Sequence, residues 1–190
     1  MVDWEQKINI LLITSMTNVQ TAPYWFSQIL SDSIGEKFIG LSSVDNLIYL
    51  STDYGVTWTI SKSIGTDDAI SYIAADSSLQ YIVAICNKTH LYYSIDFGCT
   101  FLINEVGWNA ICLLSYVNSN SSNSNPIFIA LANNIIYKSI NYGESWTVAT
   151  SELPTANCES YTSFSFDSSN QYLLVYYNVV ANFMISKASL

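Results

Sequence analysis

A short motif occurs three times in this chain, and it constrains the fold more than any other feature. Each copy has the pattern Ser-x-Asp/Asn-x-Gly-x-Thr/Ser-aromatic, in which x is any residue. The copies span residues 51–58, 94–101 and 139–146, so they start 43 and 45 residues apart. A turn motif that repeats at this period predicts a radially repeated β architecture with one small antiparallel sheet per repeat.

The residue types of the motif suit a tight turn. An Asp or Asn side chain can hydrogen-bond backbone N–H groups a residue or two further on. Glycine supplies a backbone conformation that a Cβ would penalise, and the aromatic residue can bury its ring at the start of the next strand. One carboxylate per repeat gives too few oxygen ligands for calcium, so we expect no metal site. The residues with this expected structural role are Ser51, Asp53, Gly55, Trp58, Ser94, Asp96, Gly98, Phe101, Ser139, Asn141, Gly143 and Trp146.

The motif resembles the Asp-box, or bacterial neuraminidase repeat, of β-propellers. This resemblance implies an all-β fold, a small β-propeller of four blades with four antiparallel strands each. Asp/Ser turns that precede apolar strands, at residues 32, 76 and 167, agree with the same register. We expect one domain over residues 1–190. Its blades are expected at about residues 25–61, 69–104, 110–149 and 161–190 plus 1–8.

The two ends of the chain suggest how such a ring closes. Ser186 aligns with the first motif position of the last repeat, and no fourth strand follows it. Residues 2–4 match residues 56–58, which places Trp4 at the aromatic position of the motif. We therefore expect residues 1–8 to form the outer strand of the last blade, as in the ring closure of many propellers.

Charge excludes several classes of partner. The net charge is −9, all six basic residues are lysines, and arginine is absent. An acidic chain without a basic cluster does not suit nucleic acid or an anionic membrane. Sialidases hold the substrate carboxylate with an arginine triad, so the resemblance implies no sialidase activity for this chain. No glycine-rich phosphate loop is present, and no cofactor is expected.

The apolar runs of the sequence are too short to span a bilayer, which needs roughly 20 residues. The longest one, residues 8–16, follows acidic residues rather than a basic segment, and it makes a poor signal peptide. We expect neither membrane insertion nor a signal peptide, and the compartment stays open.

The composition of the surface suggests a binding role. Charged residues make up 11% of the chain, against about 25% in a typical soluble domain. The 14 tyrosines and five tryptophans are too many for all of them to be interior. Depleted charge with exposed aromatic rings is typical of protein interfaces, although aromatic residues are also ordinary strand formers. The leading hypothesis is a non-catalytic interaction or assembly module with a protein partner.

Two alternatives concern the loops on the face opposite the motif. These loops are acidic and rich in amides, so they suit a glycan, and they equally suit plain solvation. The alternatives are a lectin-like glycan-binding propeller and a glycoside hydrolase that uses two carboxylates. A single histidine leaves little scope for a metal site or a nucleophile relay. The candidate binding residues are Asp67, Asp68, His90, Glu105 and Trp108.

Ring closure gives a first testable prediction. Deleting residues 1–8 should expose a strand edge and leave the aromatic position of Trp4 unfilled. Loss of a buried tryptophan costs about 3–5 kcal/mol, a large share of the stability of a domain. Urea unfolding of the truncated and full-length chains measures this loss, and equal midpoints would contradict closure by this segment.

Overall fold

All regular structure described for this chain is β-strand, which confirms the all-β prediction. The computed structural model describes residues 25–61, 64, 70–87, 89–108, 111–117, 125–133, 135–150, 161–166, 173–177 and 183–186. The described residues contain no helix that is long and apolar enough to cross a membrane.

The strands form four antiparallel sheets, and within each sheet the strands neighbour one another in chain order. The first sheet consists of β1 (Phe26–Ser31), β2 (Phe38–Ser42), β3 (Ile48–Ser51) and β4 (Thr59–Ile60). The second consists of β5 (Ile70–Ala75), β6 (Ile82–Cys86), β7 (His90–Ser94) and β8 (Leu102–Asn104). The third consists of β9 (Ile111–Val117), β10 (Ile127–Ala132), β11 (Ile135–Ser139) and β12 (Thr147–Thr150). The described strands of the fourth are β13 (Tyr161–Phe166), β14 (Leu173–Tyr177) and β15 (Phe183–Ser186).

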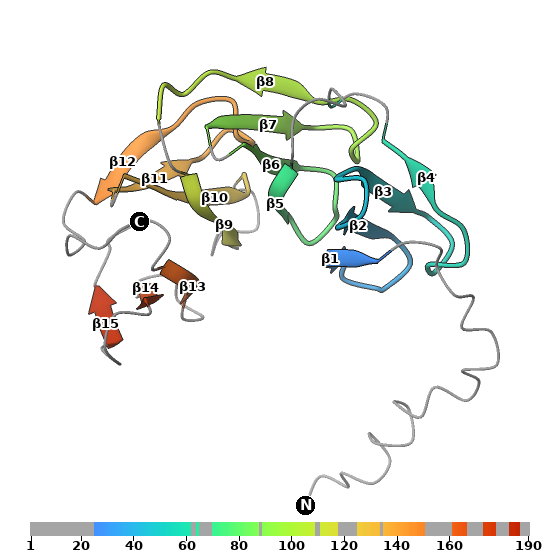
Figure 1. Ribbon diagram of the computed structural model, residues 1–190, viewed down its shortest axis with the longest axis horizontal. Coiled ribbons are helices and arrows are strands. Elements are labelled where there is room, and N and C mark those ends of the chain that lie inside the picture. Colours follow the sequence, from blue (N-terminus) through green and yellow to red (C-terminus); the bar gives the residue numbers. More distant parts are fainter. Residues whose placement is uncertain are drawn as a thin grey trace, which may run out of the picture.

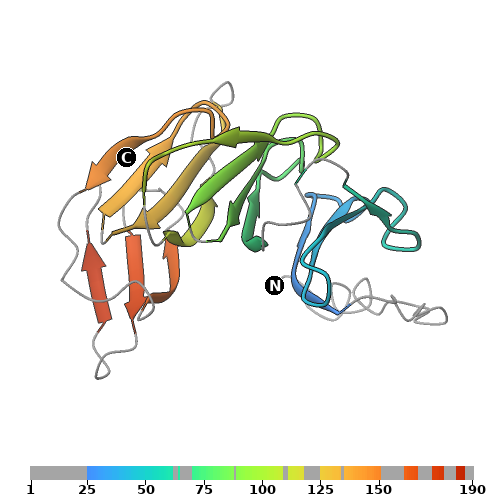
Figure 2. The same cartoon turned by 45° about the horizontal axis from the view of Figure 1, so that its top comes forward.

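The four sheets follow one another along an arc (Figures 1 and 2). The first strand of each sheet contacts the first strand of the next, so β1, β5, β9 and β13 form a continuous inner row. Among the described strands, the first and fourth sheets lie at the two ends of an open arc (Figure 1). The expected ring closure by residues 1–8, including Trp4, falls outside the described residues and stays a prediction.

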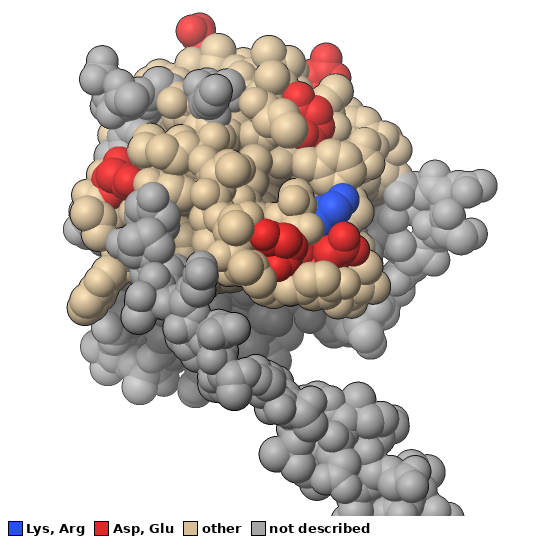
Figure 3. Space-filling model, turned by 90° about the vertical axis from the view of Figure 1, so that its right-hand side faces the viewer, with Lys and Arg blue, Asp and Glu red and all other residues tan. Residues whose placement is uncertain are grey.

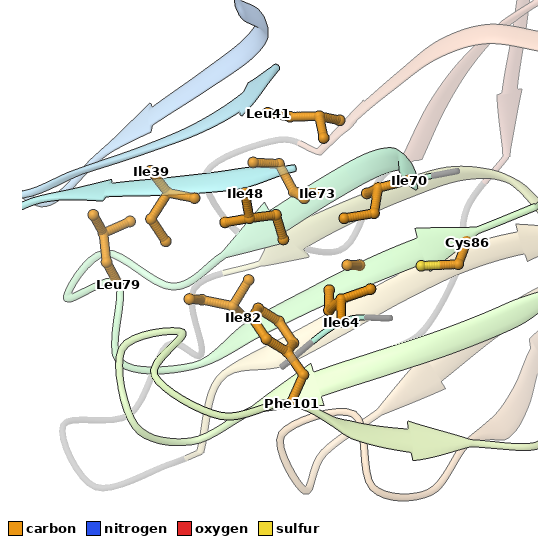
Figure 4. Close-up of a cluster of buried hydrophobic side chains, with 11 residues drawn as sticks. Ile39, Leu41, Ile48, Ile64, Ile70, Ile73, Leu79, Ile82, Cys86 and Phe101 are labelled. Carbon is orange, nitrogen blue, oxygen red and sulfur yellow. The ribbon is translucent and has the colours of Figure 1, made fainter. Parts of the chain in front are cut away.

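The core lies between the sheets. One cluster of buried side chains fills the space between the first and second sheets (Figure 4), with Ile39 and Ile48 on one side and Ile82 and Phe101 on the other. A second cluster joins the second sheet to the third. Each of these two pairs of sheets therefore has its own layer of apolar side chains.

Strand β6 shows why the central strands read as apolar runs rather than as an alternating pattern. All five of its residues are buried. Ile82, Ala84 and Cys86 face the first cluster, whereas Val83 and Ile85 face the second. Successive side chains of a strand point to opposite faces, and here a neighbouring sheet covers both faces.

A glutamine links the inner strands of the first two sheets. The Gln28 side chain on β1 donates a hydrogen bond from Nε2 to the Ile73 carbonyl oxygen at 2.7 Å. Its Oε1 accepts a hydrogen bond from the Ile73 N–H at 2.9 Å. Ile73 is fully buried, so the glutamine amide takes the place of a neighbouring strand for this peptide group.

Replacement of this glutamine should destabilise the protein. Gln28→Leu leaves the buried N–H and C=O of Ile73 without these partners, and we expect a loss of about 1–3 kcal/mol in the free energy of unfolding. Urea unfolding measures it. The matched control is Gln80→Leu, because Gln80 is at the surface and its Nε2 makes one long bond of 3.4 Å. Equal losses for the two variants would contradict the proposed link.

Candidate functional site

The first copy of the motif is a closed set of hydrogen bonds. Ser51 Oγ donates to Asp53 Oδ1 at 2.9 Å and accepts the Gly55 N–H at 2.9 Å. The Asp53 carboxylate also accepts the Thr57 N–H at 2.8 Å and the Thr57 hydroxyl at 2.6 Å. The second copy repeats these bonds, with lengths within 0.1 Å, through Ser94, Asp96, Gly98 and Thr100.

The third copy has the same geometry, but in one of its hydrogen bonds the donor and the acceptor are exchanged. Asn141 Oδ1 accepts from the Ser139 hydroxyl at 3.0 Å and from the Ser145 N–H at 2.9 Å. Its Nδ2 then donates to Ser145 Oγ at 2.9 Å, whereas in the other copies the hydroxyl is the donor. A hydroxyl can donate or accept, so the turn forms with either a carboxylate or an amide.

The aromatic residue before each motif glycine has a backbone conformation that the sequence did not reveal. Tyr54, Phe97 and Tyr142 have φ angles of 61°, 61° and 64°, in the left-handed region that non-glycine residues rarely adopt. In two copies the backbone N–H of this residue donates a hydrogen bond to a backbone carbonyl oxygen. Tyr54 donates to the Glu36 carbonyl oxygen at 2.9 Å, and Phe97 donates to that of Gln80 at 3.1 Å. The motif is thereby fixed to the first turn of its own sheet.

The hydrogen bonds of the motif lower the pKa of its two aspartates. The hydroxyl and N–H of Thr57 stabilise the Asp53 carboxylate and bring its pKa below the usual value. For Asp96, partial burial alone would raise the pKa, but the hydrogen bonds from Thr100 and Ser94 outweigh this and lower it. Both groups are therefore held in the charged form by the turn.

The motif loops and the first turns of the sheets lie on one face of the molecule. The Ser33 N–H donates to the Ser77 carbonyl oxygen at 2.8 Å, which connects the first turns of the first two sheets. The ring of Tyr142 stacks on that of Tyr81, with centroids 4.1 Å apart, and this brings the third motif to the second sheet.

Exposed apolar side chains gather on these loops, and we call them the motif face. Their exposed fractions run from 39% for Phe97 to 73% for Ile34. Figure 3 shows the side of the molecule with the first sheet, where most described atoms belong to uncharged residues. Exposed apolar side chains on ordered loops are typical of a binding surface, and here they stand beside charged residues of the same loops and turns, Glu36, Lys37, Asp53, Asp96 and Glu144. The motif face consists of Ile34, Val56, Ile95, Phe97 and Ile140.

The candidate glycan-binding residues that the structure describes differ in how exposed they are and in what they contact. Trp108 stacks on Tyr137 with centroids 3.7 Å apart and meets Trp146 edge-on at 5.7 Å. It packs against the second core cluster, so its ring is part of the contact between sheets. His90 is half-buried at the start of β7, with Nδ1 2.8 Å from the hydroxyl of the preceding threonine. Glu105 is exposed directly after β8.

Asp67 and Asp68 fall outside the described residues, so a carboxylate pair with Glu105 stays a prediction. Among the residues that the structure does describe, no group of three or more His, Cys, Asp or Glu side chains could hold a metal ion. The asparagines of this face have a structural explanation. Asn46, Asn87 and Asn133 have φ angles of 58°, 51° and 52°, and asparagine tolerates this turn conformation better than most residues.

Comparison with known proteins shows the fold. The sequence matches no family model and no curated protein. Solved structures that resemble it include YCF48 bound to a D1 peptide, with a TM-score of 0.56 and 12% identity over 87% of this chain and 56% of that one. The β-propeller domain of Cps50 (Swd1) from Myceliophteria thermophila has a TM-score of 0.60 and 12% identity over 91% and 55% of the two chains. The dihydro-heme d1 dehydrogenase NirN has a TM-score of 0.59 and 8% identity over 85% and 34%.

These likenesses support a β-propeller fold and, at such low identity, no particular activity. The chain spans about half the length of the first two proteins and about a third of the length of NirN.

The aspartates of the motif predict a dependence of stability on pH. The pKa values of Asp53 and Asp96 are lowered by folding, so their contribution to stability is present above the unfolded value of about 3.9. It is lost as the pH falls through the lowered folded values. The urea midpoint should therefore drop on going from pH 6 to about pH 3.

The matched variant is Asp53→Asn/Asp96→Asn, which should fold because Asn141 makes the same turn in the third copy. Its midpoint should fall less over this pH range, since two of the titrating groups are gone. An equal fall in both proteins would show that the motif aspartates do not contribute to the acid sensitivity.

Proposed function

We propose that this chain is an Asp-box β-propeller module that binds a protein partner through the motif face and has no catalytic activity of its own. In this proposal the motifs are structural, and residues 1–8 supply an outer strand to the last sheet. The exposed apolar side chains of the motif face bind the partner.

The motif face is the observation that carries the proposal. Ile95 and Ile140 are each more than half exposed on loops fixed by the hydrogen bonds of the motif. Ile34 is also more than half exposed, on the first turn of the first sheet, where the Tyr54 N–H donates to the Glu36 carbonyl oxygen. Exposure of these side chains to water is unfavourable by about 25 cal/mol for each Å² of apolar surface. Because the loops are already ordered, a partner that covers them gains this energy with little loss of backbone entropy.

The similar structures belong to proteins with different roles. One of the similar structures, YCF48, was solved with a bound D1 peptide, whereas another, NirN, is named as a dehydrogenase. The fold therefore accommodates both binding and catalysis. For this chain, the absence of arginine and the packed position of Trp108 favour a binding module over a glycan enzyme.

The experiment is selection of peptides from a random display library on the immobilised chain. We expect enriched peptides with apolar residues, and their affinity should fall at least about tenfold for Ile95→Asp/Ile140→Asp. The matched control is Leu102→Asp/Val148→Asp, which changes the charge equally at side chains that are 56% and 55% exposed on outer strands.

Two results would contradict the proposal. One is peptide binding that the control variant weakens as much as the motif-face variant does. The other is turnover of a substrate in a broad glycoside panel that Glu105→Gln, Asp67→Asn or Asp68→Asn abolishes, which would instead support the hydrolase alternative.

A further inference from the structure

The loops and turns around the motif face are negatively charged. Among the described residues of the three motifs and of the first turns at 32–37 and 76–81, the only basic residue is Lys37. On the side of the molecule with the first sheet, acidic atoms are more abundant than basic ones (Figure 3). The carboxylates of these loops and turns that are at least partly exposed belong to Asp32, Glu36, Asp53, Asp96 and Glu144.

These carboxylates differ in what they already bind. Asp53 and Asp96 accept hydrogen bonds from the hydroxyl and N–H groups of the motif threonines, which lower their pKa and keep them charged. The hydrogen bonds described for Glu36 and Glu144 are made by their backbone groups. The two glutamate carboxylates can therefore bind a partner without breaking the turns.

The lysine among these residues shows that the surface accommodates a cation. Nζ of Lys37 lies 4.1 Å from the centroid of the Phe97 ring, a distance at which the π electrons of a ring attract an ammonium group. Phe97 belongs to the motif face and is still 39% exposed. A basic side chain from the first sheet thus already packs on an aromatic ring of the second motif.

The second and third motifs each combine an exposed isoleucine with a carboxylate. Ile95 and Ile140 occupy the same motif position and are 51% and 62% exposed. Asp96 follows Ile95 directly, and Glu144 lies four residues after Ile140 on the same loop. Lysine and arginine have an apolar stem that covers hydrophobic surface and a charged end that remains hydrated or meets a carboxylate. Such side chains suit both elements of these loops.

We propose that the partner segment bound by the motif face is basic, with lysine or arginine side chains among its apolar ones. This inference rests on the proposed function, because it specifies the chemistry of the partner at the same surface. Opposite charge on the two surfaces speeds their encounter, and like charge disfavours acidic segments of similar apolar content. The carboxylates thus select among the apolar segments that the isoleucines could bind.

The test is selection from a random peptide library on the immobilised full chain, in parallel with Glu36→Gln/Glu144→Gln. This variant retains the backbone hydrogen bonds of both residues. We expect the wild type to enrich lysine and arginine over aspartate and glutamate. The affinity of its tightest peptide should fall at least about threefold for the variant. Raising the salt concentration from about 50 to about 300 mM should also weaken binding.

The matched control is Leu102→Lys/Val148→Lys, which makes the same change in net charge on the outer strands, at side chains that are 56% and 55% exposed. It should bind the selected peptide within about twofold of the wild-type affinity. An equal loss in the control and the glutamate variant would overturn the proposal, because net charge rather than the position of the carboxylates would then determine the preference.

The remaining outcomes separate this inference from the proposed function. Selected peptides without an excess of basic residues, whose binding still falls for Ile95→Ser/Ile140→Ser, would overturn the basic partner and leave the motif face as a binding surface. Failure to enrich any peptide, or binding that neither the isoleucine nor the glutamate variant weakens, would contradict both proposals.

Discussion

The serine hydroxyl at the head of each motif is the interaction on which the rest of the structure depends. Ser51, Ser94 and Ser139 are nearly fully buried, and each both donates to the Asp or Asn oxygen and accepts the glycine N–H. This one oxygen fixes the turn that leads from the third strand of a sheet to the fourth. In the second and third motifs the fixed turn also presents an aromatic ring and a glycine to the preceding sheet.

The hydrogen bonds and ring contacts that the turn makes offset its backbone strain. A non-glycine residue in the left-handed region costs of the order of 1 kcal/mol or more. At Tyr54 and Phe97 the same conformation directs an N–H to the carbonyl oxygen of the first turn of the sheet. At Tyr142 it places the ring on Tyr81 of the neighbouring sheet. The repeated motif thus couples order within a sheet to contact between sheets.

The sequence was sufficient to predict what depends on local chemistry. The period of the motif predicted the repeated antiparallel sheets, and the positions of Asp53 and Gly55 predicted a turn that the hydrogen bonds and φ angles confirm. The positive φ of Tyr54 could not be predicted, because aromatic residues rarely adopt it and only the completed turn enforces it. The link from Gln28 to Ile73 joins residues 45 positions apart, and no local pattern marks such a partner.

The candidate site was harder to predict for the same reason. Trp108 has the residue type of a sugar-stacking platform, but its ring packs on Tyr137 and Trp146, which come from the next sheet. Composition indicated an uncharged, aromatic surface, and the motif face is part of that surface. Its actual members are mostly isoleucines, whose exposure depends on which side of each turn faces the solvent.

The burial of β6 has a consequence for how this protein opens. Among the described strands, the main contacts between sheets join neighbours in the row, so the free energy of opening is expected to depend on position, as in one-dimensional repeat arrays. The second sheet has packed side chains on both of its faces. The amide hydrogens of Ile82–Cys86 should therefore exchange with deuterium only in the rarest and most extensive openings. The second sheet is therefore expected to be among the last parts of the described chain to open.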